Sequence, residues 1–217
     1  MRIIVIGASG RTGSLIVGAL LAAGHEVIGT IRNPKHMPAL VKAGAEVALI
    51  DLDTSSLDDI AFAMQGADAV VFAAGSSEGQ TSELDRKGTL RTVRAAEKAG
   101  VKRYVAISAI GASTGMSVRS MSDEMKDYYK QKRAAGKHIT GSSLDWTIIE
   151  PAELTDAKPT GKVTLTESLI EDVGNIPRAD VAAVTAAVLS QPKTIGHAYQ
   201  LTGGKTPIKT ALAKAVA

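Results

Sequence analysis

Cysteine is absent from the 217-residue chain, so disulfides, thiol nucleophiles and cysteine metal sites are excluded. Aromatic residues are also scarce, at 3% of the sequence, whereas hydrophobic residues as a group reach 45%. The core must therefore consist mainly of Val, Ile, Leu and Ala. This is the composition of parallel sheets that are covered by helices.

Long hydrophobic runs are missing as well. The longest extends from Leu15 to Ala23 and is far shorter than the roughly 20 residues that cross a bilayer as a helix. The short apolar run near the first residue leads into a glycine loop, which is not the pattern of a signal peptide. We therefore expect a cytoplasmic protein that makes no use of a membrane.

Neither sign of charge dominates. The chain has 25 Lys and Arg residues against 22 Asp and Glu, a formal net charge of +3. Because the basic residues are scattered, the sequence favours a small anionic cofactor over a nucleic-acid partner. The 4 histidines show no metal-ligand spacing, and no metal site is expected.

The most specific pattern lies near the first residue. Residues 3–6 are apolar and β-branched, as in a buried parallel strand. After the loop Gly7-Ala8-Ser9-Gly10-Arg11-Thr12-Gly13, one face of a predicted helix carries Leu15, Ile16, Ala19, Leu20 and Ala23. Gly24 ends this helix, and a second strand is predicted from Glu26 to Ile31.

The glycines of this loop suit a bound phosphate, because backbone N–H groups at a helix start are reachable only where no Cβ intervenes. Gly7 would let the chain turn, Gly10 would admit a pyrophosphate, and Gly13 would let the helix lie close to the strand. The spacing is G-x-x-G-x-x-G rather than the common G-x-G-x-x-G. Its place between a buried strand and an amphipathic helix nevertheless predicts a dinucleotide site.

Arg32, at the end of the second strand, indicates which dinucleotide binds. NAD sites carry an acidic residue here for the ribose hydroxyls, whereas NADP sites use arginine for the 2′-phosphate. The chain has Arg32 followed by Asn33, so NADP(H) is expected in preference to NAD(H). A solvated surface arginine is the alternative, and Arg11 is a second candidate for the same phosphate.

Strands and helices alternate along the remaining sequence. Strands are predicted at 47–50, 69–74, 103–108, 144–150, 162–166 and 198–201, and helices at 39–43, 55–65, 81–99, 123–138, 179–189 and from 207. No repeat or linker interrupts them. The fold class is therefore α/β, a single domain over 1–217 with a doubly wound Rossmann-type parallel sheet and helices on both faces. A small substrate-side region is expected from about 109–125 and 151–178.

Two further groups follow predicted strands, at the edge where α/β sheets bind ligands. Asp51 could accept a hydrogen bond from the adenine amino group, or could serve only as a turn residue. Ala73, Ala74 and Gly75 are small enough to let a ribose approach the sheet. Met116 and Met121 could form a substrate wall or simply pack their loop onto the core.

Ser108, Tyr128 and Lys132 are the candidates for chemistry. Tyr128 and Lys132 are four positions apart, so they share a face of the predicted helix. An ammonium near a phenol and a bound ribose would prepare the phenol to exchange a proton while hydride moves from nicotinamide. Tyr129 competes for this role because it precedes Arg133 by the same spacing. Tyr128 as a packing residue and Ser108 as a simple strand end remain alternatives.

Several stretches resemble the atypical short-chain dehydrogenases/reductases, more narrowly the small NAD(P)H-binding group with biliverdin/flavin reductase-like and NmrA-like proteins. They are the loop 7–13, Arg32-Asn33-Pro34, Ala95-Ala96-Glu97-Lys98-Ala99-Gly100-Val101-Lys102-Arg103, Leu144-Asp145-Trp146-Thr147-Ile148-Ile149, Thr160-Gly161-Lys162 and Gly203-Gly204-Lys205-Thr206-Pro207-Ile208. The resemblance covers nearly the whole chain.

The resemblance implies roles at the matched positions. Ser9, Arg11 and Thr12 would hold the phosphates with the glycines, Arg32 the 2′-phosphate, Asp51 and Leu52 the adenine, and Ala73, Ala74 and Gly75 the ribose side. Ser108, Tyr128 and Lys132 would border the nicotinamide, followed by Pro151 and Ala152. Similar proteins usually have Arg-Pro-Gly where this chain has Glu150-Pro151-Ala152, a change that reverses a charge and adds a Cβ beside the expected nicotinamide site.

The expected function is hydride transfer from NADPH to a small carbonyl, quinone or flavin-like acceptor, by a monomer or homodimer. A non-catalytic NADP(H)-sensing regulator, as in NmrA-like relatives, is the main alternative. A sugar-nucleotide epimerase or dehydratase is a third possibility, disfavoured because such substrates usually need an additional C-terminal domain.

Overall fold

The computed structural model describes residues 1–75 and 83–217. Within these ranges one nine-stranded sheet has the order β11-β8-β10-β6-β5-β4-β1-β2-β3, and β7 pairs in parallel with β9 in a separate two-stranded sheet. The strands are β1 (Arg2–Ile6), β2 (Glu26–Ile31), β3 (Glu46–Leu49), β4 (Ala69–Phe72), β5 (Arg103–Ile107), β6 (Asp145–Pro151), β7 (Glu153–Thr155), β8 (Lys162–Thr166), β9 (Asn175–Pro177), β10 (His197–Gly203) and β11 (Thr206–Pro207).

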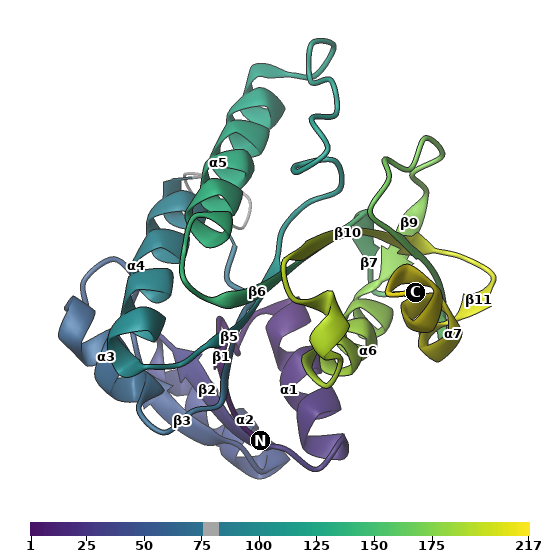
Figure 1. Ribbon diagram of the computed structural model, residues 1–217. Helices are drawn as coiled ribbons and strands as arrows, with labels where there is room; N and C mark the ends of the chain where they lie inside the picture. The colour runs from purple at the N-terminus through teal and green to yellow at the C-terminus, as the bar shows by residue number, and fades with distance from the viewer. Residues whose placement is uncertain (76–82) are drawn as a thin grey trace.

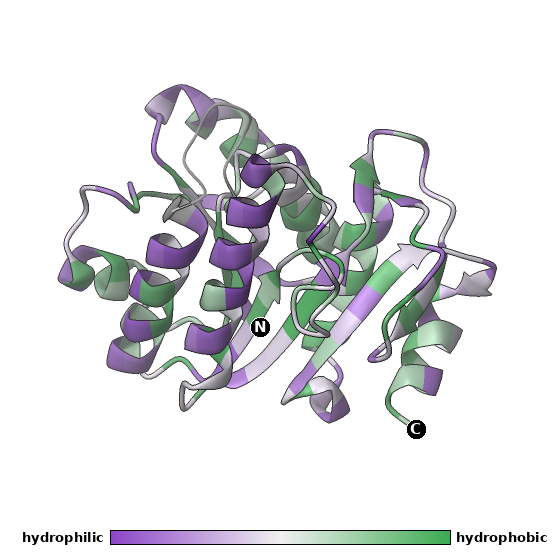
Figure 2. Ribbon diagram, turned by 90° about the horizontal axis from the view of Figure 1, so that it is seen from above, coloured by the Kyte–Doolittle hydropathy of each residue, from purple (hydrophilic) through white to green (hydrophobic). Residues whose placement is uncertain are grey.

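Helices cover both faces of the large sheet (Figure 1). They are α1 (Arg11–Ala22), α2 (Met37–Ala43), α3 (Leu57–Met64), α4 (Glu83–Ala99), α5 (Asp123–Thr140), α6 (Arg178–Leu189) and α7 (Ile208–Ala215), with short 3₁₀ turns at Pro34–His36 and Pro192–Thr194. The helices carry hydrophilic residues beside hydrophobic ones (Figure 2), as expected for elements with one buried side.

Strand β1, which lies between β4 and β2, divides the core between the two faces. Ile3 and Val5 pack in a cluster with α1, α2, α6 and α7, whereas Ile4 and Ile6 pack in a cluster with α3, α4 and α5. Successive strand residues point to opposite faces, so all four are nearly inaccessible to solvent. The unbroken apolar run in the sequence thus reflects burial on both sides, and the fold is doubly wound as predicted.

The chain changes direction across the sheet between β1 and β4. From β1 it proceeds outward through β2 to β3, and then continues on the other side through β4, β5 and β6. In open α/β sheets, ligands bind outside the carboxyl ends of the strands at this switch point. The glycine loop after β1 and the residues 73–75 after β4 lie on the two sides of it.

The sheet is only mostly parallel. Strand β8 pairs antiparallel with both β10 and β11, so this edge is an exception within the parallel sheet that was predicted. The hydrophobic pattern of residues 162–166 identified the strand but carries no information on its direction. Strands β7, β9 and β11 were not predicted, because segments of two or three residues are too short to show a periodicity.

Helix α1 buries a slightly different face from the predicted one. Its buried residues are Gly13, Ile16, Val17 and Leu20, whereas Leu15 is 41% exposed. The stripe starts at Gly13 and follows the i, i+3, i+4, i+7 spacing, so the prediction erred by starting at Leu15. The predicted bounds of β2 and β8 are confirmed; the predicted start of α4 at residues 81–82 lies outside the described residues.

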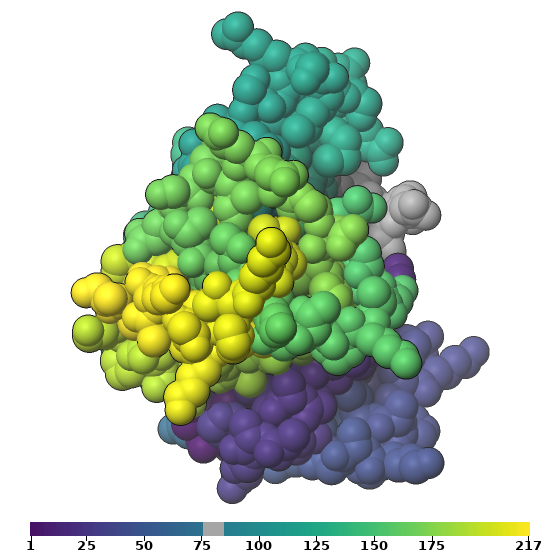
Figure 3. Space-filling view, turned by 90° about the vertical axis from the view of Figure 1, so that its right-hand side faces the viewer, coloured from purple at the N-terminus to yellow at the C-terminus, as the bar shows by residue number. Residues whose placement is uncertain are grey.

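The carboxyl-terminal part of the chain completes the side of the molecule beyond β6. It forms a green-to-yellow face above the purple amino-terminal segment (Figure 3), and α6 packs against α1 in the core. Asp180 of α6 is buried and accepts hydrogen bonds from the N–H groups of Thr160 and Gly161, at 2.9 Å each. This contact fixes the turn before β8 to the start of α6.

Candidate functional site

The glycine loop joins β1 to α1 through very close backbone contacts. Gly7 has φ +82° and donates its N–H to Thr30 Oγ1 at 3.2 Å. A Cβ on Gly13 would lie 2.1 Å from the carbonyl oxygen of Gly7, and one on Gly7 would lie 2.8 Å from Ala74 Cα. Only glycine satisfies these distances, which agrees with the turn predicted at Gly7 and the close approach of helix and strand predicted at Gly13.

The start of α1 faces a large cavity. Gly10 is the N-cap residue, and within the described ranges no side chain caps it. Ser9, Gly10, Arg11 and Thr12 line the cavity. Backbone N–H groups of a first helical turn have no partner within the helix, so this end of α1 provides donors for an anion such as a phosphate.

The cavity has a volume of about 980 Å³ and runs along the carboxyl ends of the central strands. This is near the upper end of the usual ~300–1,000 Å³ for small-molecule sites. The lining residues are Ile6, Gly7, Ser9, Gly10, Arg11, Thr12, Thr30, Ile31, Arg32, Ile50, Asp51, Leu52, Asp53, Ala73, Ala74, Gly75, Asp85, Ile107, Ser108, Tyr128, Lys132, Leu154 and Arg178. One cavity thus unites most residues predicted to bind the cofactor with the three predicted to do chemistry.

One end of the cavity follows β2 and β3. Arg32 is exposed there, next in sequence to β2. Asp51 accepts a hydrogen bond from the N–H of Asp53 at 2.9 Å, so its turn role is observed while the carboxylate still lies at the cavity wall. Arg91 of α4 donates to the carbonyl oxygens of Leu52 and Ser55 and holds this loop in place.

Arg11 points toward a different part of the wall. It forms an ion pair with Asp156, which also accepts a hydrogen bond from Arg178 Nη1 at 2.8 Å. Hydrogen bonding to Arg11, together with the charge of both arginines, lowers the pKa of Asp156. Because Asp156 follows β7 and Arg178 begins α6, Arg11 is directed away from the β2 end, where Arg32 lies.

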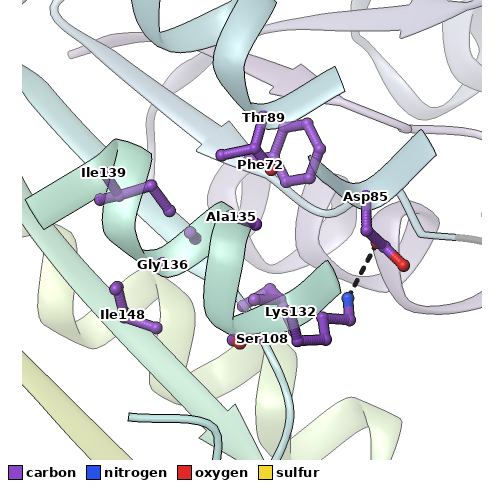
Figure 4. Close-up of a pocket in the computed structure, with 11 residues that line it drawn as sticks. Phe72, Asp85, Thr89, Ser108, Lys132, Ala135, Gly136, Ile139 and Ile148 are labelled. Atoms are coloured by element: carbon purple, nitrogen blue, oxygen red, sulfur yellow. Dashed lines mark hydrogen bonds and ion pairs between the residues drawn. The ribbon is translucent and has the colours of Figure 1, made fainter. Parts of the chain in front are cut away.

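The opposite end of the cavity contains Lys132 in a buried ion pair. Its Nζ lies 2.9 Å from Asp85 Oδ1 of α4, and the two side chains are 9% and 1% exposed. The same ammonium lies 5.5 Å from the centre of the Tyr128 ring, within the range of cation–π attraction. Ser108 follows β5 at the same wall (Figure 4).

Tyr128 and Tyr129 take different positions. Tyr128 lines the cavity, whereas Tyr129 is buried in a small cluster with Ala109 and Ala112, beside Met116 and Met121. Burial raises the pKa of Tyr129. Only Tyr128 therefore lies where it could meet a ligand, and the two methionines pack their loop onto α5.

The two segments predicted to form a small substrate-side region differ in what they contribute to the cavity wall. Segment 151–178 supplies Leu154 and Arg178 to its wall, whereas the lining includes no residue of 109–125. Pro151 and Ala152, predicted to border the cofactor, do not line it. Their main chains bond to neighbouring segments, the Pro151 carbonyl to the N–H of Ile110 and the Ala152 N–H to the carbonyl of Leu201.

Glu150 is turned away from the cavity. The residue is 1% exposed, and its carboxylate accepts hydrogen bonds from Ser113 N at 2.8 Å and Ser113 Oγ at 3.0 Å, and another from Gln200 Nε2. Gln200 Oε1 in turn accepts from the N–H of Gly111 at 2.7 Å. The unusual Glu150 thus fixes the loop after β5, and it does not add a negative charge to the cavity wall.

Burial raises the pKa of Glu150, despite the hydrogen bonds that oppose the shift. Protonated Glu150 therefore stabilises the folded state. This stabilisation is fully present below the pKa that Glu150 has in the unfolded state, and it is lost as pH rises through the higher pKa of the folded state. We expect Glu150→Gln to remove this pH dependence and to lose about 1–3 kcal/mol of unfolding free energy, since an amide donor then faces Gln200 Nε2. Urea unfolding across pH measures both. Glu153→Gln, at an exposed position, should change neither; an unchanged pH profile in Glu150→Gln would contradict this role.

Among the residues that sequence reasoning missed at or beside the cavity, four polar ones form contacts that shape it. They are Thr30, which holds Gly7, and Asp85, Asp156 and Arg178, whose ion pairs join distant elements. Thr30 had a local signal, since it lies in a predicted strand next to the glycine loop. No local sequence pattern indicated Asp85, Asp156 or Arg178.

Two features are absent from the part of the chain that the structure describes. In the described ranges, no helix combines the length and hydrophobicity needed to cross a bilayer. Nor do these ranges hold three or more His, Cys, Asp or Glu residues grouped to bind a metal ion.

The sheet, its switch point and the glycine loop define a Rossmann-fold dinucleotide-binding protein. The model of the NAD(P)H-binding family matches residues 7–192, so the chain belongs to this family.

Three similar proteins carry different names. The chain is 35% identical over 219 residues to the "Uncharacterized sugar epimerase YhfK" of Bacillus subtilis (strain 168), covering 99% of this chain and 100% of that protein. It is 33% identical to a candidate NAD-dependent epimerase/dehydratase from Bacillus halodurans, with a TM-score of 0.90 over 98% of this chain and 99% of the other. It is also 26% identical to Quinone oxidoreductase 2 of Escherichia coli (strain K12), over 97% and 72% of the two chains.

Proposed function

We propose that the protein is an NADPH-dependent oxidoreductase that passes hydride to a small carbonyl, quinone or flavin-like acceptor. The observation that carries this proposal is that Ser108, Tyr128 and Lys132 share one cavity with the glycine loop. Binding of a dinucleotide and chemistry at its far end would thus occur in a single site. The name of the Escherichia coli relative supports a quinone as one acceptor class.

The order of the strands supports one orientation of the cofactor. With the adenosine half at Asp51 and Leu52 and the 2′-phosphate at Arg32, the pyrophosphate would meet the loop of Gly7, Gly10 and Gly13. The second half would then extend past β4 to β5. It would pass Ala73, Ala74 and Gly75 and reach Ser108, Tyr128 and Lys132.

When bound, the nicotinamide would supply a hydride to the acceptor. Lys132 would donate hydrogen bonds to the adjacent ribose, and Tyr128 would exchange the proton of a carbonyl acceptor, aided by Ser108. A quinone or flavin acceptor could instead take its proton from water, because the cavity is open to solvent at exposed residues such as Ser9 and Gly75. Tyr128 is therefore expected to matter most for carbonyls.

The test is NADPH oxidation, followed by absorbance, against panels of carbonyls, quinones and flavins. We expect turnover of at least one class, and a loss of about 10²–10⁴-fold in carbonyl reduction in Tyr128→Phe. Tyr129→Phe is the matched control, because the neighbouring ring lies outside the cavity. If Tyr128→Phe leaves every turnover untouched, Tyr128 is not the acid.

The names of the two Bacillus proteins favour a second candidate, an NAD(P)-dependent sugar epimerase or dehydratase. Such an enzyme returns the hydride to its own substrate, so it would interconvert sugar nucleotides without net oxidation of NADPH. A non-catalytic sensor would bind NADP(H) tightly, reduce no acceptor, and change its protein partners with the redox state of the cofactor. The acceptor panel, run beside a sugar-nucleotide product assay and pull-downs, separates the three functions.

A further inference from the structure

The ion pair of Asp85 and Lys132 joins two helices at the far end of the cavity. Asp85 lies near the start of α4 and Lys132 in the middle of α5, separated by 47 positions in sequence. The carboxylate and the ammonium both belong to the cavity wall. They meet at 2.9 Å, where both side chains are almost fully buried (Figure 4). A charge buried to this extent requires a partner, and Asp85 is the partner of Lys132.

Few other groups could take the place of Asp85. Behind the pair lies a pocket of only about 10 Å³, near the lower limit for one water molecule. Its polar lining comes from Asp85, Thr89, Ser108 and Lys132, and its remaining walls are formed by Phe72, Ala106, Ile107, Ala135, Gly136, Ile139 and Ile148. On this side of the pair, solvent therefore has little room to replace the carboxylate.

The pair also faces the path of the ligand. A Cβ on Gly75 would lie 3.5 Å from Asp85 Oδ1 and 3.9 Å from Lys132 Nζ, so the backbone after β4 runs directly beside both groups. Gly75 is itself exposed and lines the cavity. A ligand that follows the carboxyl ends of β1 and β4 would thus reach the ammonium at this glycine.

We propose that Asp85 is a positioning residue, which holds the Lys132 ammonium at Gly75 so that the ribose hydroxyls in the second half of a bound dinucleotide meet a fixed donor. This inference rests on the orientation given under the proposed function. Asp85 acts through Lys132 and has no part in binding the adenosine half. Burial is the largest single effect and disfavours the ammonium, but the charge and hydrogen bond of Asp85 together with Tyr128 outweigh it and raise the pKa of Lys132, which keeps the lysine charged.

The experiment compares the complete cofactor with its adenosine half. Calorimetry measures the Kd of NADPH and of adenosine 2′,5′-bisphosphate for the parent and for Asp85→Asn. We expect about tenfold or greater weakening for NADPH, the usual loss when a charge-assisted hydrogen bond is misplaced, and no change for the fragment. Asp58→Asn is the control, because it breaks the exposed pair of Asp58 with Lys98 and should leave both constants unchanged.

Two results would overturn the inference. Equal weakening of NADPH and the fragment would show that Asp85 only supports the fold, and unchanged NADPH binding would show that it does not position Lys132. No turnover is measured, so a protein that binds the cofactor but reduces no acceptor tests the inference equally well. If the unmodified protein binds NADH more tightly than NADPH, the same comparison is made with NADH and ADP. The inference about Asp85 is then tested independently of the NADP assignment.

A second comparison covers the case in which Asp85→Asn does not fold. The double variant Asp85→Asn/Lys132→Met leaves no unpaired buried charge, and it is compared with Lys132→Met alone. If Asp85 acts through Lys132, the two variants bind NADPH equally. Weaker binding by the double variant would mean that Asp85 has a role independent of Lys132, which would contradict the inference.

Discussion

Replacing Gly13 by alanine is expected to destabilise the protein and to weaken dinucleotide binding at the same time. The new Cβ would lie 2.1 Å from the carbonyl oxygen of Gly7 and 2.9 Å from its carbonyl carbon, so α1 must move away from the loop. Overpacking of this kind costs about 1–3 kcal/mol, which corresponds to a fall in Tm of roughly 2–12 °C for a chain of this length. Because the same movement displaces the N–H donors at the start of α1, we expect about tenfold or greater loss of NADPH affinity.

Gly18→Ala is the matched control for this variant. Gly18 lies on the same helix, but a Cβ there meets no atom within 4 Å. Alanine should stabilise the helix by about 0.5–1 kcal/mol and leave NADPH binding unchanged. Thermal unfolding and calorimetry measure both effects. If Gly13→Ala behaved like Gly18→Ala, the loop would not depend on close contact between Gly7 and Gly13.

Arg32→Glu is expected to reverse the cofactor preference. Arg32 lines the end of the cavity after β2, where a 2′-phosphate would lie. Loss of a charge-assisted bond of about 1.5–3 kcal/mol weakens NADPH about ten- to a hundredfold, and the new carboxylate repels the phosphate further. NADH affinity should be retained or improved, because a carboxylate at this position can accept hydrogen bonds from ribose hydroxyls.

Lys35→Glu provides the control for charge alone. Lys35 is an exposed cation three positions beyond Arg32, but it does not line the cavity. The substitution changes the net charge by the same amount and should alter NADPH affinity only slightly, in a salt-dependent manner. If Arg32→Glu and Lys35→Glu weakened NADPH binding equally, Arg32 would act through the overall electrostatic potential of the protein and not through contact with the phosphate.

The parts of the site that could be predicted are those encoded locally. Strand β1, the glycine loop, α1 and β2 are consecutive in sequence, and the buried strand, the helix periodicity and the glycine spacing each carry a signal. The bounds of β2 were predicted residue by residue. Arg32 was found for the same reason, since its place is fixed by the end of that strand.

The missing parts depend on contacts between distant residues. Asp85 is one of many charged residues on α4, and only the folded arrangement shows that it faces Lys132 of α5. Glu150 was expected to alter the nicotinamide site because it stands where similar proteins usually carry an arginine beside that site. Its side chain instead meets Ser113 and Gln200, which are 37 and 50 positions away. A sequence pattern indicates which face of a helix or strand is buried. It does not indicate which side chains of other elements that face contacts.

The proposed site therefore combines two kinds of structure. The adenosine end consists of a loop and strand ends close together in sequence, while the far end is assembled from α4, α5 and the segment after β5. Two buried acids hold this far end together: Asp85 fixes Lys132, and Glu150 fixes the loop that leads from Ser108. Substitutions there are expected to alter the chemistry before they alter cofactor selection.

The most direct test of the central claim is the Kd of the unmodified protein for NADPH and for NADH, measured by calorimetry under the same conditions. The proposed contact of Arg32 with the 2′-phosphate implies that NADPH binds about ten- to a hundredfold more tightly. Equal affinities, or a preference for NADH, would contradict the NADP assignment and with it the proposed NADPH-dependent activity.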